Sequence, residues 1–473
     1  MSIFTSFIDD VCNFDLLTRE ILNTARLKIK KYRSRKSESY PVRKLVHGKI
    51  LTKSGQLLAR NLVNKLRRKN YVFSIPKILF QPKLKNPSYK YTHDEAKRLL
   101  KINDPKFLEE YRPVSIPPLH DIIVQKRILN ELRKILDPDF STNSFAYRSD
   151  NKNFNCSTAV KKMSLLRSRY KFVAKIDIKR FFDEIDHGIL KFILREKLEK
   201  LRIKTQVIDF ILEIISNFLK ITPKMKGHDS KGHPYEFKGI PQGGPLSTLV
   251  SNLYLDVLDK EFHRNNVEFI RYADDIIIFS ENREIARNNL NIYELFLKNN
   301  LCLNVGSKNN VHSFEEGFDY LGFHFKNESK LIREKTIEKF KDKIRQITIR
   351  KNKKRMLFLK LNRYIKTINM VIGYIPKREK GQPKKNLFVP KYAWAKYFCL
   401  AYEPNDLILK QLKDLDCFIR DRLRRLYCLM FNKSIDFKKQ DKSKALFINK
   451  TNRKFKHNGL KTLEESFFRL KRD

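Results

Sequence analysis

The sequence has 473 residues, a length that suits about two or three domains with cores of their own. Hydrophobic residues make up 41% and aromatic residues 12% of the chain, which excludes an intrinsically disordered protein. The excess of 100 Lys and Arg over 52 Asp and Glu gives a formal net charge of +48, so a polyanionic partner is expected: nucleic acid first, an anionic membrane second.

Local patterns disfavour a transmembrane, secreted or zinc-module protein. No apolar run approaches the length of a transmembrane helix, and the first ten residues lack the basic-then-apolar order of a signal peptide. The six cysteines are scattered, with no CxxC pair and no His at ligand spacing, which is typical of thiols in a reducing compartment. We therefore expect a cytoplasmic protein with no membrane partner.

Residues 1–90 are predicted to form a basic, mainly helical N-terminal extension. Seven of the eleven residues from Arg26 to Lys36 are Lys or Arg. Such a run is either a solvated helix face or a set of phosphate contacts, and the pattern favours neither. Prolines at positions 76, 82 and 87 then indicate an exposed connection to the next domain.

An extended segment and a helix are predicted next. The segment Arg112–Pro117 begins with an Arg-Pro pair, which fits a turn or a contact to a triphosphate. Apolar residues then recur at helical spacing from Asp121 to Ile135, and Asp137-Pro138 is expected to end that helix.

A short strand is predicted to end near Ile178, before the chain turns into another helix. This arrangement presents Asp177 at a strand end, where a carboxylate can lie beside a second acidic segment. Asp183 and Asp186 are expected to cap or decorate the turn rather than to bind a metal. A long amphipathic helix is predicted from Thr205 to Leu219.

Glycines surround Gln242 in the segment 239–244. Glycine allows a ligand to approach the backbone closely, and the following Pro245 and Ser247 are typical of a loop that enters a helix.

Two short, largely apolar runs, 269–271 and 276–279, flank the sequence Tyr-Ala-Asp-Asp. Each is β-branched or aromatic and too short for a helix, so a β-hairpin with Asp274 and Asp275 at its tip is predicted. Burying two acids between apolar strands is costly unless a cation compensates, which favours a divalent metal site. The alternative is a solvated turn, since Asp is common in turns.

The order of these motifs resembles that of bacterial reverse transcriptases of the group II intron-like lineage, most of all the free-standing, defence-associated ones. Five segments carry the resemblance: Arg112–Pro117, Asp177–His187, Ile240–Gly243 with Leu246-Ser247, Tyr272–Asp275 and Phe318–Phe323.

This resemblance implies an α+β right-hand polymerase. Fingers and palm would occupy residues 91–325, with an antiparallel palm sheet packed on helices, and a helical thumb (326–435) and a basic tail (436–473) would follow. A thumb helix is expected to have an apolar core face with Leu415, Phe418, Ile419 and Leu423. Its arginines Arg420, Arg424 and Arg425 would bind nucleic acid, the alternative being ordinary surface charge.

The resemblance also implies roles for site residues. Asp177, Asp274 and Asp275, with the backbone carbonyl of Ile178, would hold two Mg²⁺ ions, with Mn²⁺ as the substitute metal. Phe182 is similar to an aromatic floor beneath the nucleotide sugar, where a ring would clash with a 2′-hydroxyl. Nucleotide contacts are implied for Lys106, Arg112, Gln242, Gly243 and Lys308.

The activity that follows from the resemblance is RNA-directed DNA synthesis from dNTPs, with a DNA product. A dedicated structured non-coding RNA is expected as template or scaffold, in bacterial antiphage defence. The alternative is a group II intron maturase that assists RNA splicing and mobility. The intact Asp177, Asp274 and Asp275 argue against a purely structural role.

Overall fold

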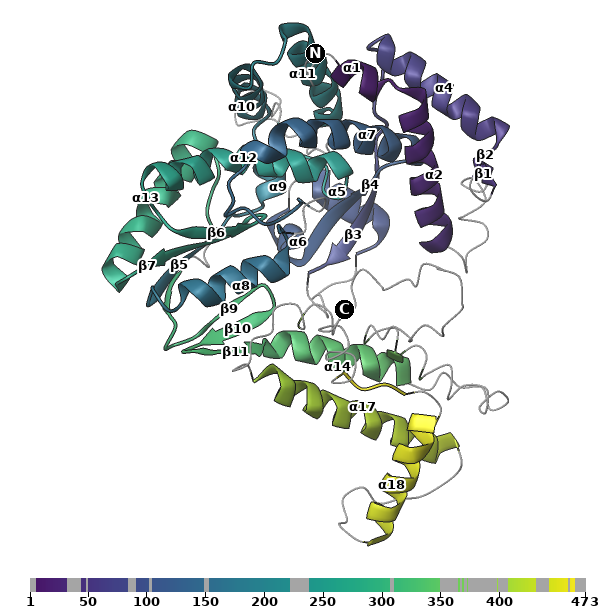
Figure 1. Ribbon diagram of the computed structural model, residues 1–473, viewed down its shortest axis with the longest axis vertical. Helices are drawn as coiled ribbons and strands as arrows, with labels where there is room; N and C mark the ends of the chain where they lie inside the picture. The colour runs from purple at the N-terminus through teal and green to yellow at the C-terminus, as the bar shows by residue number, and fades with distance from the viewer. Residues whose placement is uncertain are drawn as a thin grey trace. The chain divides into compact units, whose positions relative to one another are not determined.

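The computed structural model describes residues 6–31, 44–47, 50–83, 91–101, 104–148, 153–221, 238–306, 310–348, 365, 368–369, 372, 398, 407–430, 442–457 and 460–463. The fold is mixed α+β, mostly helical with small antiparallel sheets, which confirms the predicted class (Figure 1). Among these residues, no helix has both the length and the apolar character needed to cross a bilayer.

The chain divides into two compact units. The first contains residues 1–154, 174–278 and 287–310, and the second contains residues 155–173, 279–286 and 311–473. The domain boundaries predicted after residues 90, 325 and 435 stay predictions.

Helices make up most of the first unit. They are α1 (Ser6–Val11), α2 (Phe14–Lys31), α4 (Lys53–Arg67), α5 (His93–Lys101), α6 (Pro105–Glu110), α7 (Leu119–Leu136), η1 (Asp137–Asp139), α9 (Phe181–Glu184), α10 (His187–Lys200), α11 (Thr205–Leu219), α12 (Pro245–Arg264) and most of α13 (Arg283–Leu301). The helices predicted at 121–135 and 205–219 are confirmed as α7 and α11, and Asp137-Pro138 ends α7 as expected.

Strands pair locally around these helices. Short pairs are formed by β1 (Val46–His47) with β2 (Ile50–Leu51) and by β3 (Lys77–Pro82) with β4 (Tyr111–Ile116). The largest sheet has the order β6 (Phe269–Tyr272), β7 (Asp275–Ser280), β5 (Phe172–Asp177) and β8 (Asn310–Ser313).

Helix α12 is the buried centre of the first unit. It packs against α7 and α10, and thirteen of its twenty residues are buried. Five of the buried side chains are polar or charged: Ser247, Ser251, Asn252, Asp256 and Asp259. Because a buried polar group is costly unless it is hydrogen-bonded, each of these must find a partner inside the protein.

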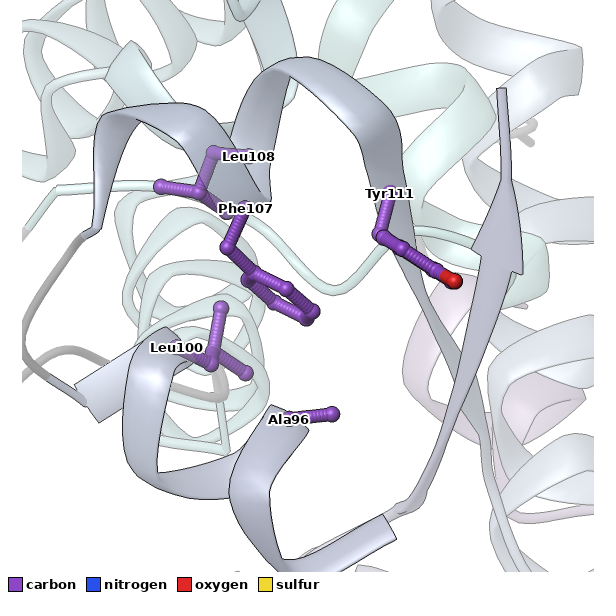
Figure 2. Close-up of a cluster of buried hydrophobic side chains, with 5 residues drawn as sticks. All are labelled: Ala96, Leu100, Phe107, Leu108 and Tyr111. Atoms are coloured by element: carbon purple, nitrogen blue, oxygen red, sulfur yellow. The ribbon is translucent and has the colours of Figure 1, made fainter. Parts of the chain in front are cut away.

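An aromatic cluster holds the β3-β4 pair in place. The side chains of Ala96, Leu100, Phe107, Leu108 and Tyr111 are buried together between α5, α6 and β4 (Figure 2). The rings of Phe107 and Tyr111 stack with centroids 5.3 Å apart, and Phe80 of β3 contacts Phe107 edge-on at 5.5 Å. This packing uses one face of the β3-β4 pair, and Arg112 and Ile116 on the opposite face of β4 are exposed.

The described part of the second unit contains helices and a three-stranded sheet. Its elements are α8 (Cys156–Leu166), β9 (Phe318–Tyr320), β10 (Phe323–Lys326), β11 (Ser329–Ile332), α14 (Glu334–Thr348), α17 (Ile408–Met430) and α18 (Lys442–His457). The side chain of Gln411 in α17 makes two bonds to the backbone of Ile332, accepting from its N–H at 2.7 Å and donating to its carbonyl at 3.0 Å. Helix α17 is therefore fixed to the end of the sheet.

Candidate active site

The predicted hairpin is confirmed, and its tip is a strained turn. Strands β6 and β7 are antiparallel, with Tyr272 opposite Asp275, so Ala273 and Asp274 form a two-residue loop. We call Tyr272–Asp275 the acidic turn. Ala273 has a φ of +61°, a left-handed conformation that costs a residue with a Cβ on the order of 1 kcal/mol. Something in the surrounding structure must compensate for that cost.

The side chain of a buried arginine, Arg271, binds the acidic turn. Arg271 is completely buried and forms a two-pronged ion pair with the equally buried Asp259 of α12. Its Nε donates to Asp259 Oδ1 at 2.7 Å and its Nη2 to Oδ2 at 2.5 Å. The Nη1 group donates to Asn252 Oδ1 and to the Ala273 carbonyl oxygen, at 3.1 Å each. The guanidinium thus joins α12 directly to the strained residue of the turn.

Burial dominates the electrostatics of the two acids in the turn. It raises the pKa of Asp274 above its ordinary value, and the charge of Asp177 adds to the rise while Arg112 opposes it. Burial also raises the pKa of Asp275, against the opposing effect of Lys175, whose Nζ lies 3.3 Å from Asp275 Oδ1. The three predicted acids are therefore close enough to repel one another.

Asp177 lies at the end of β5, as predicted. The N–H of Gly306 donates to its backbone carbonyl oxygen at 2.6 Å. A Cβ on Gly306 would lie 2.8 Å from Asp177 Oδ2, closer than such atoms approach, so glycine makes room for this carboxylate. The next residue, Ile178, is buried and bridges Val305. The segment 304–306 therefore covers the strand end.

The chemistry of the acids fits a divalent cation. Carboxylate and carbonyl oxygens are the ligands that Mg²⁺ prefers, and a cation would offset the burial and repulsion that raise the pKa values of Asp274 and Asp275. Within the part of the chain that the structure describes, however, no three His, Cys, Asp or Glu side chains converge at metal-binding spacing. To bind a metal ion, Asp275 would have to give up its ion pair with Lys175.

The segment 239–244, which we call the glycine loop, packs against β4. The N–H of Ser115 donates to the Gln242 carbonyl oxygen at 2.6 Å. Gly243 has a φ of +114°, and a Cβ there would lie 2.7 Å from the carbonyl oxygen of Ser115. Gly243 is therefore required by both its backbone conformation and the close approach of the two segments. Arg112, on the same strand, is exposed.

The side chain of Asp183 binds the glycine loop through Gln242. It accepts from Gln242 Nε2 at 3.2 Å and from Arg180 Nε at 3.3 Å, a role beyond the turn decoration expected for it. Asp186 does cap a helix, because its side chain accepts from the first N–H groups of α10. Phe182 is half-buried, and its carbonyl oxygen accepts from Ile240 N at 2.7 Å.

Two lysines of this region are Lys106, the predicted nucleotide contact, and Lys83. Lys106 is exposed on α6, whose buried side is occupied by Phe107 and Leu108. Lys83 follows β3 and donates to the Leu108 carbonyl oxygen at 2.6 Å. Burial lowers the pKa of Lys83, and the charge of Arg112 lowers it further. Lys308 lies outside the described residues.

The second unit holds the predicted thumb arginines, on α17. Of the expected core face, Leu415, Ile419 and Leu423 are buried, while Phe418 is half-buried under the guanidinium of Arg345. Arg425 is exposed, and Arg420 is half-buried beside Cys417.

Arg424 departs from the expectation of a solvent-facing guanidinium. It is only 5% exposed, and it donates to Asn452 Oδ1 at 2.7 Å and Thr451 Oγ1 at 3.3 Å, both on α18. It also forms an ion pair with Asp421. Arg424 therefore joins α17 to α18, because α18 packs over that side of α17.

Sequence reasoning missed the residues that support the acids. Arg271, Asp259 and Lys175 received no role from their local pattern. One signal was present, since Arg271 is a lone charge in an otherwise apolar strand and must have a buried partner. Nothing local identifies that partner as Asp259.

Comparison with known proteins decides what kind of domain carries this site. Residues 101–325 match the family described as reverse transcriptase (RNA-dependent DNA polymerase). This segment is a reverse transcriptase domain. It contains Asp177, the acidic turn, the glycine loop and Arg112, so the predicted resemblance to reverse transcriptases holds for this segment.

Two bacterial proteins, one of them encoded by a group II intron, are similar to this reverse transcriptase domain. The chain is 29% identical over 170 residues to the group II intron-encoded protein LtrA of Lactococcus lactis, covering 36% of this chain and 26% of LtrA. It is 29% identical over 163 residues to protein YkfC of Escherichia coli, covering 34% of this chain and 39% of YkfC. The chain thus spans well under half the length of either relative.

A solved structure shows a weak likeness. The telomerase of Candida albicans, in complex with the TWJ fragment of telomeric RNA, is 13% identical with a TM-score of 0.37, covering 90% of this chain and 79% of the other.

The raised pKa of Asp274 leads to a stability prediction. A carboxyl whose folded pKa lies above its unfolded value, ordinarily about 3.9, costs stability once the pH exceeds the folded pKa and costs nothing below the unfolded one. We expect Asp274→Asn to raise the midpoint of thermal unfolding at pH 7 in EDTA. The gain should disappear toward about pH 3.5.

The matched control is Asp209→Asn, which removes an exposed carboxylate whose partner is Arg195. It should change the midpoint little at either pH, because an exposed ion pair contributes at most about 1 kcal/mol. A lower midpoint for Asp274→Asn at pH 7 would contradict the electrostatic account.

Proposed function

We propose that this chain is an RNA-directed DNA polymerase that makes cDNA with the help of divalent metal ions. The observation that carries the proposal lies inside the reverse transcriptase domain: the end of β5 brings Asp177 close to the half-buried Asp274 and Asp275. A domain with only a structural role gains nothing from keeping three repelling carboxylates together at a cost in stability.

The carboxylates of Asp177, Asp274 and Asp275 would hold the metal ions, with the backbone carbonyl oxygen of Ile178 as a further ligand. When bound, two such ions supply the charge that activates a primer hydroxyl and stabilises the leaving pyrophosphate. Burial raises the pKa of Asp274 and of Asp275, and a bound cation would oppose this rise and keep both carboxylates charged. Lys175 would balance the charge of Asp275 when the cation is absent.

Nucleotide binding is proposed for the face of β4 that lies opposite the aromatic cluster. Arg112 is exposed there, and its charge already lowers the pKa of Asp274, so it can pair with a phosphate near the acids. Gln242, held by Asp183, would contact the nucleotide or template, with Gly243 allowing close approach. Phe182 would lie beneath the sugar. Lys106 and Lys308 stay proposals from the resemblance.

In right-hand terms, β3, β4, α5 and α6 would form the fingers, and the sheet with α7 and α10–α12 would form the palm. Helices α14, α17 and α18 would form the thumb. Its exposed Arg425 and half-buried Arg420 would bind nucleic acid, whereas Arg424 would act by joining the two helices.

Helix α4 supports an RNA partner for the N-terminal extension. It contains no Asp or Glu, and its buried residues all lie on one face. The opposite face exposes Lys53, Arg60, Lys65 and Arg67, and the next residues, Arg68 and Lys69, are exposed as well. A cationic face of this kind attracts a phosphate backbone irrespective of sequence.

For the biological role, we propose synthesis of cDNA on a dedicated structured non-coding RNA in bacterial antiphage defence. The second candidate is a group II intron maturase and reverse transcriptase, and the similarity to LtrA favours it. The two roles share the chemistry and differ in the RNA.

Identifying the bound RNA separates the two roles. The protein would be purified with its nucleic acid, the RNA sequenced, and the DNA made on addition of dNTPs analysed. A single non-coding RNA without self-splicing elements, recovered with cDNA copied from it, is expected for defence. Recovery of an intron ribozyme would contradict that role and support the maturase.

The double substitution Asp274→Asn with Asp275→Asn tests the polymerase site. We expect dNTP incorporation on a primed RNA template to fall by about 1000-fold or more, because the ligands of the metal ions are lost. Affinity for the same RNA should stay within about twofold, because phosphate contacts made by other residues supply it. Full incorporation by the folded double variant would refute the assignment.

Phe182→Ala tests the proposed sugar contact. Removal of the ring should raise the incorporation of rNTPs relative to dNTPs by roughly tenfold or more, since a single steric contact is worth about 1–3 kcal/mol. The control is Phe192→Ala, which removes a ring that is 68% exposed on α10. An unchanged ratio in Phe182→Ala would exclude a role for Phe182 in sugar selection.

A further inference from the structure

The acidic turn receives its support from one side of α12. Asn252 and Asp259, seven positions apart and therefore on the same face of the helix, both bind the guanidinium of Arg271. Arg271 in turn donates to the carbonyl oxygen of Ala273, the residue with positive φ. The chain of contacts from helix to turn contains only buried groups, so water cannot substitute for any of them.

The same face of α12 also holds the segment next to the turn. The Nδ2 of Asn252 donates to the Ala146 carbonyl oxygen at 2.8 Å. Further along, the backbone of Arg271 accepts from Phe145 N and donates to Asn143 O, at 2.9 Å each. Residues 143–146 and the acidic turn are thus fixed to one another and to one helix.

This arrangement does more than fill the core. Burial of an ion pair is no better for stability than apolar packing of the same volume, because desolvation offsets the attraction. Arg271 does what an apolar side chain cannot: it donates a hydrogen bond to the carbonyl of a strained turn residue, in a direction set by its pairing with Asp259. That bond fixes the peptide plane between Ala273 and Asp274, and hence the direction in which Asp274 leaves the backbone.

We propose that Asp259 and Asn252 are positioning residues that act through Arg271 to hold Asp274 in its working orientation. The proposal rests on the polymerase function proposed above. A buried ion pair can affect the stability of the fold, and any other buried pair can do the same. Only the pair of Arg271 and Asp259 would also orient the acidic turn.

A matched pair of variants on α12 tests this separation. Asp256 is 2% exposed and, like Asp259, is buried against a cation, with Lys197 Nζ 2.5 Å from its Oδ2. Its other ion-pair partner is Lys260, and neither lysine belongs to the hairpin. Asp259→Asn and Asp256→Asn each replace one buried carboxylate by an amide of the same shape. Both substitutions should lower thermal stability. A difference in activity between the two variants therefore cannot be explained by the loss of a buried ion pair alone.

The expected difference lies in turnover. On a primed RNA template, below the unfolding range of both variants, Asp259→Asn should lower kcat for dNTP incorporation by about tenfold or more, since small misplacements of catalytic groups cost up to about 100-fold. The KM for dNTP should change by less than about threefold, because nucleotide contacts come from other residues. Asp256→Asn should keep kcat within about twofold of the wild type.

A second readout does not depend on activity. Mn²⁺ should raise the unfolding midpoint of the wild type and of Asp256→Asn, and should raise that of Asp259→Asn less, because binding to the folded state stabilises it. If Asp259→Asn fails to fold, Asn252→Ala replaces it, with Ser251→Ala as control. Ser251 is equally buried, and its hydroxyl donates to Thr248 O within the same helix.

The outcomes are distinguishable. Equal losses of kcat in the two aspartate variants, or none in folded Asp259→Asn, would overturn the positioning role while leaving the polymerase intact. A wild type that incorporates no dNTP would instead overturn the proposed function, and the Mn²⁺ shifts would then decide the positioning role alone.

Discussion

One guanidinium buried entirely from water carries the arrangement of the acidic turn. Arg271 lies on β6, and its side chain contacts both α12 and the acidic turn. Its carboxylate partner Asp259 is buried to the same extent. An unpaired charge at this depth would cost several kcal/mol, so the two side chains must be present together for either to be tolerated. The fold therefore makes the geometry of the turn conditional on a contact between a helix and a strand.

Close approach of backbones is the second constraint on the site. Gly306 leaves room for the carboxylate of Asp177, and Gly243 lets its loop lie against the carbonyl of Ser115. Neither position can accept a Cβ without movement of its neighbours. Backbone contacts therefore hold residue 306 against Asp177 and, separately, the glycine loop against β4, while the aromatic cluster around Phe107 packs on β4 as well.

Much of this could be predicted from local sequence. The hairpin with Asp274 at its tip, the strand ending at Asp177, and helices α7 and α11 all follow from apolar periodicity and from turn residues, which act over a few neighbouring positions. The order of the motifs along the chain then indicated the reverse transcriptase domain. These features depend on contacts between neighbours in the sequence, so the sequence by itself determined them.

The tertiary structure decided which charges are buried and which lysine lies near Arg112. Nothing in the neighbourhood of Arg424 distinguishes it from Arg425, yet α18 covers the first and leaves the second exposed. Lys83 lies beside Arg112 because β3 pairs with β4 across a long connection. Asp259 likewise is a partner of Arg271 only because α12 packs against β6. The physical reason is the same in each case: the cost of a charge depends on its desolvation and its partner, and both are set by segments distant in the sequence.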